Sequence, residues 1–183
     1  IGNSAGDAGG GLELDNETAD VTGCHFEGNY ANRVGGLHSW TNEGRLTISD
    51  STFRENTAGD CGGAISMDNN PHTVTLERLH LTDNYAVDGA AFCVDLVMIE
   101  PDEDENFDPY YHHSYALLKS SFISDNDAED DGGIAYVKGG TLTMVNVTTH
   151  DNDSPHNGGV AIKEDGVGDF TNVIFSGVDG DVL

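Results

Sequence analysis

Phe53-Arg54-Glu55-Asn56, followed by Gly62-Gly63-Ala64-Ile65, is the stretch of sequence that decides the fold. The same succession of an asparagine and a small-residue pair recurs along the chain of 183 residues. The recurring asparagines are Asn3, Asn29, Asn56, Asn84, Asn126 and Asn152. Their intervals are 26 (3 to 29), 27 (29 to 56), 28 (56 to 84), 42 (84 to 126) and 26 (126 to 152) residues. A period of this length is typical of a solenoid of stacked identical units.

The segments between the turns predict strands rather than helices. With 24 glycines and four prolines, no stretch keeps apolar residues at helical spacing for long. A short segment such as Ala64–Met67 follows each small pair, and a longer alternating one such as Val74–Leu81 comes after a polar connection. The alternation in Val74–Leu81 breaks once, as at a bend between two strands. Two or three short strands per repeat predict the coils of an all-β, single-stranded parallel β-helix.

The recurring asparagines and small pairs have structural roles in such a coil. Asparagine tolerates the left-handed backbone conformation of a sharp corner. Its amide can also donate to and accept from the coils above and below, which predicts a hydrogen-bonded asparagine ladder. The small pairs are expected at tight corners that need positive φ or a close approach of the backbone.

These motifs resemble those of a known family. Phe26-Glu27-Gly28-Asn29 and Phe53-Arg54-Glu55-Asn56 match F-x-x-N, and Gly62-Gly63-Ala64-Ile65 matches G-G-A-I, so the chain resembles the repeats of chlamydial polymorphic membrane proteins. The resemblance implies a right-handed, pectin-lyase-like β-helix of about six to seven coils of 26–28 residues. It also implies a surface passenger domain that acts in adhesion, with no catalytic residues to carry over.

The charge of the chain limits its partners. Seven Lys and Arg against 33 Asp and Glu give a formal net charge of −26, which argues against nucleic acid and anionic membranes as partners. Asp60, Asp88 and Asp130 each fall four residues after a repeat asparagine, so neighbouring coils would bring carboxylates together. They are candidate ligands for Ca²⁺, and the alternative is a solvated acidic coat.

Cysteines and glycosylation sequons leave several roles open. Cys24, Cys61 and Cys93 occupy different columns of the repeat, and either buried thiols or one disulfide with a spare thiol is compatible with them. Asn16 and Asn146 begin sequons and are the candidate glycosylation sites. Asn152 also begins one, but it is expected to be buried in the ladder.

The long interval of 42 residues marks an insertion at Met98–Ser114 within one β-helical domain, residues 1–183. An acidic run there precedes Tyr110, Tyr111, His112 and His113, which are candidate contact residues for a glycan, a metal or a neighbouring subunit.

Taken together, the sequence predicts a non-catalytic extracellular scaffold of structural or adhesive type, located at the cell surface. Both ends fall part-way through a coil, so the segment is expected to belong to a longer solenoid or filament. Its expected partners are neighbouring β-helix segments, packed end to end or laterally, and glycans. The alternative is a fragment of a polysaccharide-acting lyase or hydrolase, which many parallel β-helices are. The basic residues of this chain are few and scattered, and the sequence offers no candidate catalytic residue.

Overall fold

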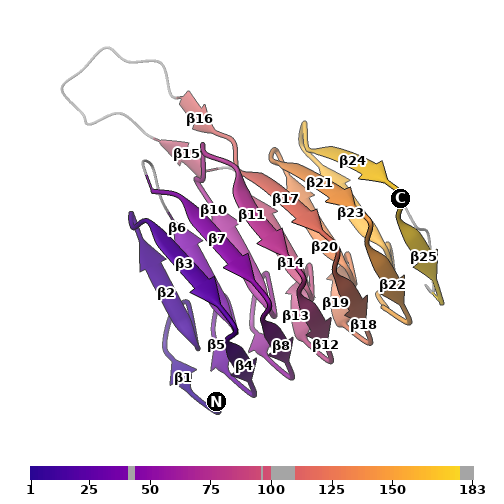
Figure 1. Ribbon diagram of the computed structural model, residues 1–183, viewed down its shortest axis with the longest axis horizontal. Helices are drawn as coiled ribbons and strands as arrows, with labels where there is room; N and C mark the ends of the chain where they lie inside the picture. The colour runs from indigo at the N-terminus through magenta and orange to yellow at the C-terminus, as the bar shows by residue number, and fades with distance from the viewer. Residues whose placement is uncertain (41–43, 96, 100–109, 178–183) are drawn as a thin grey trace.

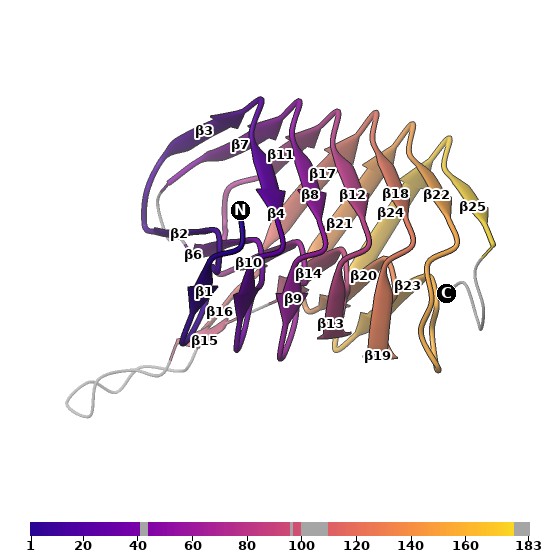
Figure 2. The same cartoon turned by 90° about the horizontal axis from the view of Figure 1, so that it is seen from below.

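The computed structural model describes residues 1–40, 44–95, 97–99 and 110–177. These residues form a right-handed parallel β-helix of about six coils, and they contain no helix, so the predicted fold is confirmed. Figure 1 shows the coils stacked side by side from the N-terminal to the C-terminal end. Figure 2 shows the strands of successive coils aligned as the walls of the solenoid.

Four parallel sheets run along the solenoid; in the described residues sheets B, C and D have six strands each and sheet A has five. Sheet A consists of β1 (Ser4–Ala5), β5 (Tyr30–Ala31), β9 (Thr57–Ala58), β13 (Tyr85–Asp88) and β19 (Asp127–Asp131). Sheet B consists of β2 (Leu12–Asp15), β6 (Leu37–Trp40), β10 (Ile65–Asp68), β14 (Phe92–Asp95), β20 (Ala135–Lys138) and β23 (Val160–Lys163). Sheet C consists of β3 (Ala19–Thr22), β7 (Leu46–Ser49), β11 (Val74–Glu77), β17 (Tyr115–Lys119), β21 (Thr141–Val145) and β24 (Val167–Thr171). Sheet D consists of β4 (His25–Glu27), β8 (Thr52–Arg54), β12 (His80–Thr82), β18 (Phe122–Ser124), β22 (Thr148–His150) and β25 (Ile174–Ser176).

The strand content of a coil exceeds the two or three strands that the sequence predicts. Sheets B, C and D correspond to the predicted segments, and the break in Val74–Leu81 is the corner at Arg78, where φ is +53°. Sheet A is the sheet that the sequence does not predict. Its strands in the first three coils have two residues each, which is too short for an alternating pattern to be recognised.

The predicted insertion begins and ends as an antiparallel hairpin. Strand β15 (Val97–Ile99) pairs with β16 (Tyr110–His112), and the hairpin projects from one edge of the stack (Figure 1). Residues 100–109 and the side chains of Tyr110, Tyr111 and His112 lie outside the described part of the chain. Residues 178–183 lie outside it as well.

The asparagine side chains form a continuous hydrogen-bonded ladder between sheets D and A. The Nδ2 of each asparagine donates to the Oδ1 of the asparagine in the next coil at 2.7–2.9 Å, from Asn3 through to Asn152. The same Oδ1 also accepts the backbone N–H of the preceding asparagine, as Asn84 Oδ1 does from Asn56 at 3.1 Å. All members except the exposed Asn3 are buried. Each interior amide therefore satisfies both its own polar atoms and backbone groups of its neighbours.

A further bond explains the spacing of the F-x-x-N motif. The Nδ2 of Asn56 donates to the carbonyl oxygen of Phe26 at 3.0 Å, and Asn84 makes the same bond to Phe53. The first residue of the motif in one coil thus presents its carbonyl to the asparagine of the next coil. Its side chain points into the core, where Phe26 and Phe53 stack with ring centroids 4.5 Å apart.

The predicted left-handed conformation lies one residue before the asparagine, so its assignment to the asparagine itself was wrong. Positive φ is found at Glu55 (+53°), Asp83 (+56°) and Asp125 (+56°), each directly before a ladder asparagine. The chain turns at that residue, and the following asparagine points inward to bond the backbone of the corner. Asp and Gly at this column tolerate positive φ, whereas Glu55 adopts it without that advantage.

The small pairs occupy the corner between sheets A and B as expected. Gly62 has φ of +78°, and a Cβ on Gly63 would lie 2.5 Å from the carbonyl oxygen of Ala90 in the next coil. The repeat slips by one residue in the second coil, because Leu37 pairs with Ile65 and Val34 therefore stands opposite Gly62. The pair Gly35-Gly36 is thus offset by one position from the pair in the third coil.

Removing one amide from the middle of the ladder should be costly. Asn84→Ala removes the hydrogen bonds of this amide to the carbonyl of Phe53, to the backbone N–H and side chain of Asn56 and to the side chain of Asn126, in a dry interior. We expect a loss of about 3 kcal/mol in the free energy of unfolding, or roughly 6–12 °C in Tm. Thermal melting followed by circular dichroism measures it. Asn3→Ala, at the exposed end of the ladder, is the matched control and should change Tm little, and an equal effect of both variants would contradict a ladder-based stability.

Candidate functional site at the corner between sheets A and B

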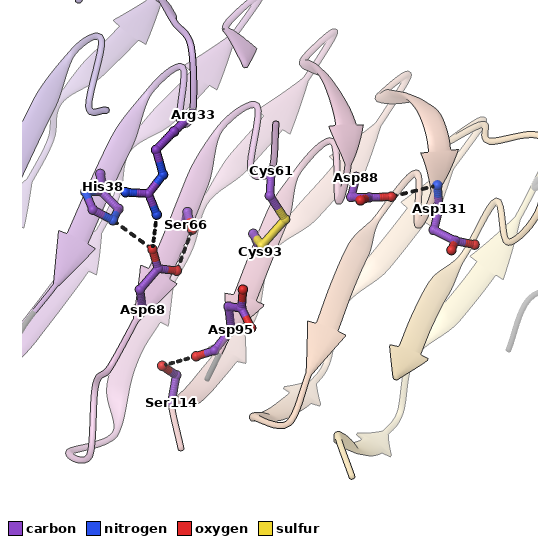
Figure 3. Close-up of a disulfide and its surroundings, with 10 residues drawn as sticks. All are labelled: Arg33, His38, Cys61, Ser66, Asp68, Asp88, Cys93, Asp95, Ser114 and Asp131. Atoms are coloured by element: carbon purple, nitrogen blue, oxygen red, sulfur yellow. Dashed lines mark hydrogen bonds and ion pairs between the residues drawn. A yellow bond between two sulfur atoms is a disulfide. The ribbon is translucent and has the colours of Figure 1, made fainter. Parts of the chain in front are cut away.

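The corner that leads from sheet A to sheet B brings polar residues of several coils together. Arg33, Cys61, Asp88 and Asp131 follow one another along the corner, one from each of four consecutive coils. They face the outer side of sheet B, where His38, Ser66, Cys93 and Tyr136 stand in register in the same four coils. Figure 3 shows most of this corner, with Arg33 pointing toward Asp68, Cys61 bonded to Cys93, and Asp88 pointing toward Asp131.

Three of the four corner residues are joined to sheet B of the following coil. The guanidinium of Arg33 donates to Asp68 Oδ2 at 3.3 Å. Cys61 forms a disulfide with Cys93, and the carboxylate of Asp131 lies 3.0 Å from Lys163 Nζ. An ion pair, a disulfide and a second ion pair thus cross the corner diagonally and bind adjacent coils together; Figure 3 shows the first two.

Asp68 is the centre of a closed polar cluster. His38 Nε2 lies 3.0 Å from Asp68 Oδ2, and the hydroxyl of Ser66 donates to Asp68 Oδ1 at 3.1 Å. Asp68 and His38 are 5% and 1% exposed. The other ring nitrogen of His38, Nδ1, lies 3.6 Å from Glu13 in the first coil, so the imidazole spans three coils.

This cluster offers little room for a substrate. The cavity beside it, lined by Arg33, Asp60, Asp95 and the disulfide among others, has a volume of about 30 Å³, enough for water molecules only. A general base must reach the proton that it abstracts, and both carboxylate oxygens of Asp68 already accept hydrogen bonds from within the chain. The cluster therefore holds adjacent coils together at this corner.

Within the part of the chain that the structure describes, Asp88, Asp130 and Asp131 form a group of carboxylates that could hold a metal ion. One oxygen from each lies within 4.8 Å of the others. Two of the three candidate ligands, Asp88 and Asp130, are thus brought together, whereas Asp60 stands outside this group and Asp131 takes its place. An irregularity between β13 and β19 places Asp131 beside Asp88: Ala86 pairs with Ala128, but Asp88 pairs with Asp131, which leaves one extra residue in β19. On the other side of Asp88 the paired residue is Cys61, so Asp60 is offset by one position.

The three carboxyl groups differ in their electrostatic environment. Burial raises the pKa of Asp88, and the charges of Asp130, Asp131 and Asp60 raise it further, against the hydrogen bond from the Asp131 N–H. Burial opposes ionisation of Asp131 too, but hydrogen bonds from Lys163 and Asn157 hold its pKa below the ordinary value. Asp130 lies 2.6 Å from His156 Nδ1. Asp88 is the member of the group whose charge is disfavoured.

The remaining candidate residues lie away from this corner. Asn16 and Asn146 are exposed at turns with φ of +57° and +55°, where a glycan would have space, whereas Asn152 is fully buried in the ladder. Cys24 is a free, exposed thiol. His113 is exposed, and its Nδ1 donates a hydrogen bond to the carbonyl of Gly139, so it packs against the following coil.

The sequence leaves one disulfide with a spare thiol open but does not identify the paired cysteines, and it does not predict the Asp68 cluster. Cys61 stands in the corner column of one coil and Cys93 in the outward column of sheet B in the next, so they are neighbours only on a diagonal. Arg33 and Asp68 are related by a similar diagonal, which reaches two residues farther along sheet B. Columns compared at equal offsets from the asparagine bring neither pair together.

Comparison with protein-family models, with curated proteins and with solved structures finds no match to this chain. In the described residues, no helix has the length and apolar character that crossing a lipid bilayer requires.

The disulfide should be a major source of stability. It closes a separation of 32 residues, for which the loss of entropy in the unfolded chain corresponds to about 3–4 kcal/mol. We expect the double variant Cys61→Ser/Cys93→Ser to melt roughly 7–14 °C below the wild type under non-reducing conditions. Cys24→Ser is the control and should leave Tm unchanged. A double variant as stable as the wild type would contradict the bracing role.

Asp88 allows a test of both its charge and the predicted calcium site. Since its folded-state pKa is raised, its stabilising contribution is full below the ordinary value of 3.8 and is lost as pH rises through the folded pKa. Without Ca²⁺, Asp88→Asn should therefore stabilise the protein at pH 7 by about 0.5 kcal/mol, or ~1–2 °C, and have no effect at pH 3.

With Ca²⁺ the wild type should be more stable than Asp88→Asn. If the three carboxylates bind the ion, the wild type gains about 2.7 kcal/mol when Ca²⁺ is a hundredfold above Kd, and Asp88→Asn gains much less. The exposed Asp20→Asn, on sheet C, is the control and should respond as the wild type does. Melting curves that are the same with Ca²⁺ and with EDTA would exclude structural calcium.

Proposed function

We propose that this chain is a non-catalytic, extracellular β-helical scaffold of structural or adhesive type. The observation that carries the proposal is the row of diagonal links across the corner between sheets A and B, in which Arg33, Cys61 and Asp131 engage Asp68, Cys93 and Lys163. In this corner the reactive side chains bond one another. Such an arrangement favours a rigid support for surface contacts over a site that must bind and release a substrate.

The disulfide supports the extracellular location. Disulfides persist in secreted and surface proteins and are rare where thiols are kept reduced. Cys61–Cys93 lies within a stack already held by backbone pairing, so it adds resistance to unfolding under harsh conditions. The exposed sequon residues Asn16 and Asn146 are compatible with glycosylation in the same compartment.

The charge supports contacts with neutral or cationic partners. A formal net charge of −26 favours a well-solvated surface and repels nucleic acid, anionic membranes and other copies of the chain at low ionic strength. Lateral packing with neighbouring β-helix segments, which the scaffold role includes, would therefore need cations between them.

The alternative, a polysaccharide-acting enzyme, would need an open cluster of carboxylates with a basic residue. The larger depression on the surface, about 400 Å³ in volume at the corner between sheets C and D, is lined by Arg78, His80 and Asn146 among others. The guanidinium of Arg78 is held by Asp50 at 2.6 and 2.7 Å and also contacts Glu77. Among the residues that line this depression, Arg78 is the one with a permanent positive charge, and that charge is already paired with carboxylates. We therefore rank the enzyme function second.

An activity assay separates the two functions. The chain is incubated with a panel of neutral and acidic polysaccharides, with and without Ca²⁺, and new chain ends are measured by reducing-end and unsaturated-product assays. We expect no turnover above the buffer blank. Turnover that is abolished by Asp68→Asn or Arg78→Ala, and kept by Asp20→Asn, would overturn the scaffold function, provided that circular dichroism shows the variants to be folded.

A further inference from the structure

Two tyrosines expose their rings in one column of sheet A. Tyr30 is 45% exposed and Tyr85 is 36% exposed, and both pair with Thr57, which lies between them in the intervening coil. They are thus two coils apart, or about 9.6 Å along the solenoid axis. Because the side chain of Thr57 is small, the surface between the two rings is lower than the rings themselves.

The hydroxyl bonds show how the rings lie. Tyr30 donates to the side chain of Asn32 at 3.2 Å, two residues farther along its own strand. Tyr85 donates to Glu129 at 3.1 Å, which stands two residues beyond Asp127, the partner of Tyr85 in the next coil. Tyr30 therefore leans along its own strand, and Tyr85 leans along its strand and across to the next coil. Both rings lie on the outer side of the sheet and are partly exposed to solvent. Burial raises the pKa of Tyr85, and its hydrogen bond with Glu129 raises it further, so the hydroxyl stays protonated at neutral pH.

Hydrogen-bond acceptors surround the rings, and the strands of sheet A carry no lysine or arginine. Asn32, Asp127 and Glu129 are exposed on the same side of the sheet. This combination of flat aromatic faces and oxygen acceptors suits a ligand with partly positive C–H faces and many hydroxyl donors, which is the chemistry of a sugar ring. The carboxylates repel polyanions, including acidic polysaccharides and a second copy of this chain.

We propose that the outer face of sheet A binds a neutral polysaccharide that lies along the solenoid axis, with two of its rings stacked on Tyr30 and Tyr85. The two-coil separation is comparable with the length of a disaccharide unit in an extended chain, so alternate sugars would meet the two tyrosines and the sugar between them would lie over Thr57. This inference rests on the adhesive function proposed above and names the class of ligand for it.

Calorimetric titration of the full chain with neutral hexasaccharides of β-linked glucose, xylose, mannose and N-acetylglucosamine tests the proposal, with oligogalacturonate as the acidic comparison. We expect at least one neutral series to bind and oligogalacturonate not to bind. Tyr30→Ala and Tyr85→Ala should each raise Kd roughly tenfold, because each removes one stacking face. Tyr30→Phe and Tyr85→Phe keep the ring and should stay within about threefold of the wild type.

Tyr115→Ala is the matched control, because Tyr115 is 41% exposed but belongs to sheet C. Absence of binding to every neutral series, or an equal loss in Tyr115→Ala, would overturn the proposal, and so would tight binding of oligogalacturonate. Product analysis of the same mixtures keeps the two proposals distinguishable. Ligands that are neither bound nor cleaved contradict the glycan-binding face alone, whereas ligands that are cleaved contradict the scaffold function.

Discussion

The buried amide ladder is the interaction on which the rest of this structure depends. A parallel β-helix must turn its chain several times in each coil, and every turn removes backbone groups from sheet pairing. At the corner between sheets D and A those groups would be buried without partners, at a cost of about 1–3 kcal/mol each. The asparagine amides supply the missing donors and acceptors in every coil, and because each amide also bonds the next, they hold all coils in one register.

The repeat itself, the class of fold and the position of the insertion follow from the sequence, because the ladder demands an asparagine at one position in each coil. The finer geometry does not follow from it. The one-residue slip at Val34 and the extra residue in β19 do not change the asparagine spacing in a recognisable way, yet they decide which side chains meet. The asparagine spacing groups Asp60 with Asp88 and Asp130, whereas in the structure it is Asp131 that joins Asp88 and Asp130.

Contacts that cross diagonally from one coil to the next could not be assigned from the asparagine spacing either. The period identifies residues that stack directly above one another, such as Phe26 and Phe53. It does not show that the corner column faces the outer column of sheet B, because this depends on the angle at which sheets A and B meet. Cys61–Cys93 and Arg33–Asp68 both cross that angle, so their pairing became visible only in three dimensions.

In-register stacking also creates the main electrostatic problem of this chain. Each column places equivalent residues about 4.8 Å apart, so an acidic sequence repeats like charges at short distance. The chain separates some of them with the few cations it has: Lys119 stands above Glu77 at 3.1 Å, and Lys163 reaches Asp131. With seven basic residues against 33 acidic ones, most columns have no such partner. The ladder, the apolar core and the disulfide must therefore supply the stability that offsets this repulsion, so salt and divalent cations should stabilise the solenoid as a whole through screening, beyond any single binding site.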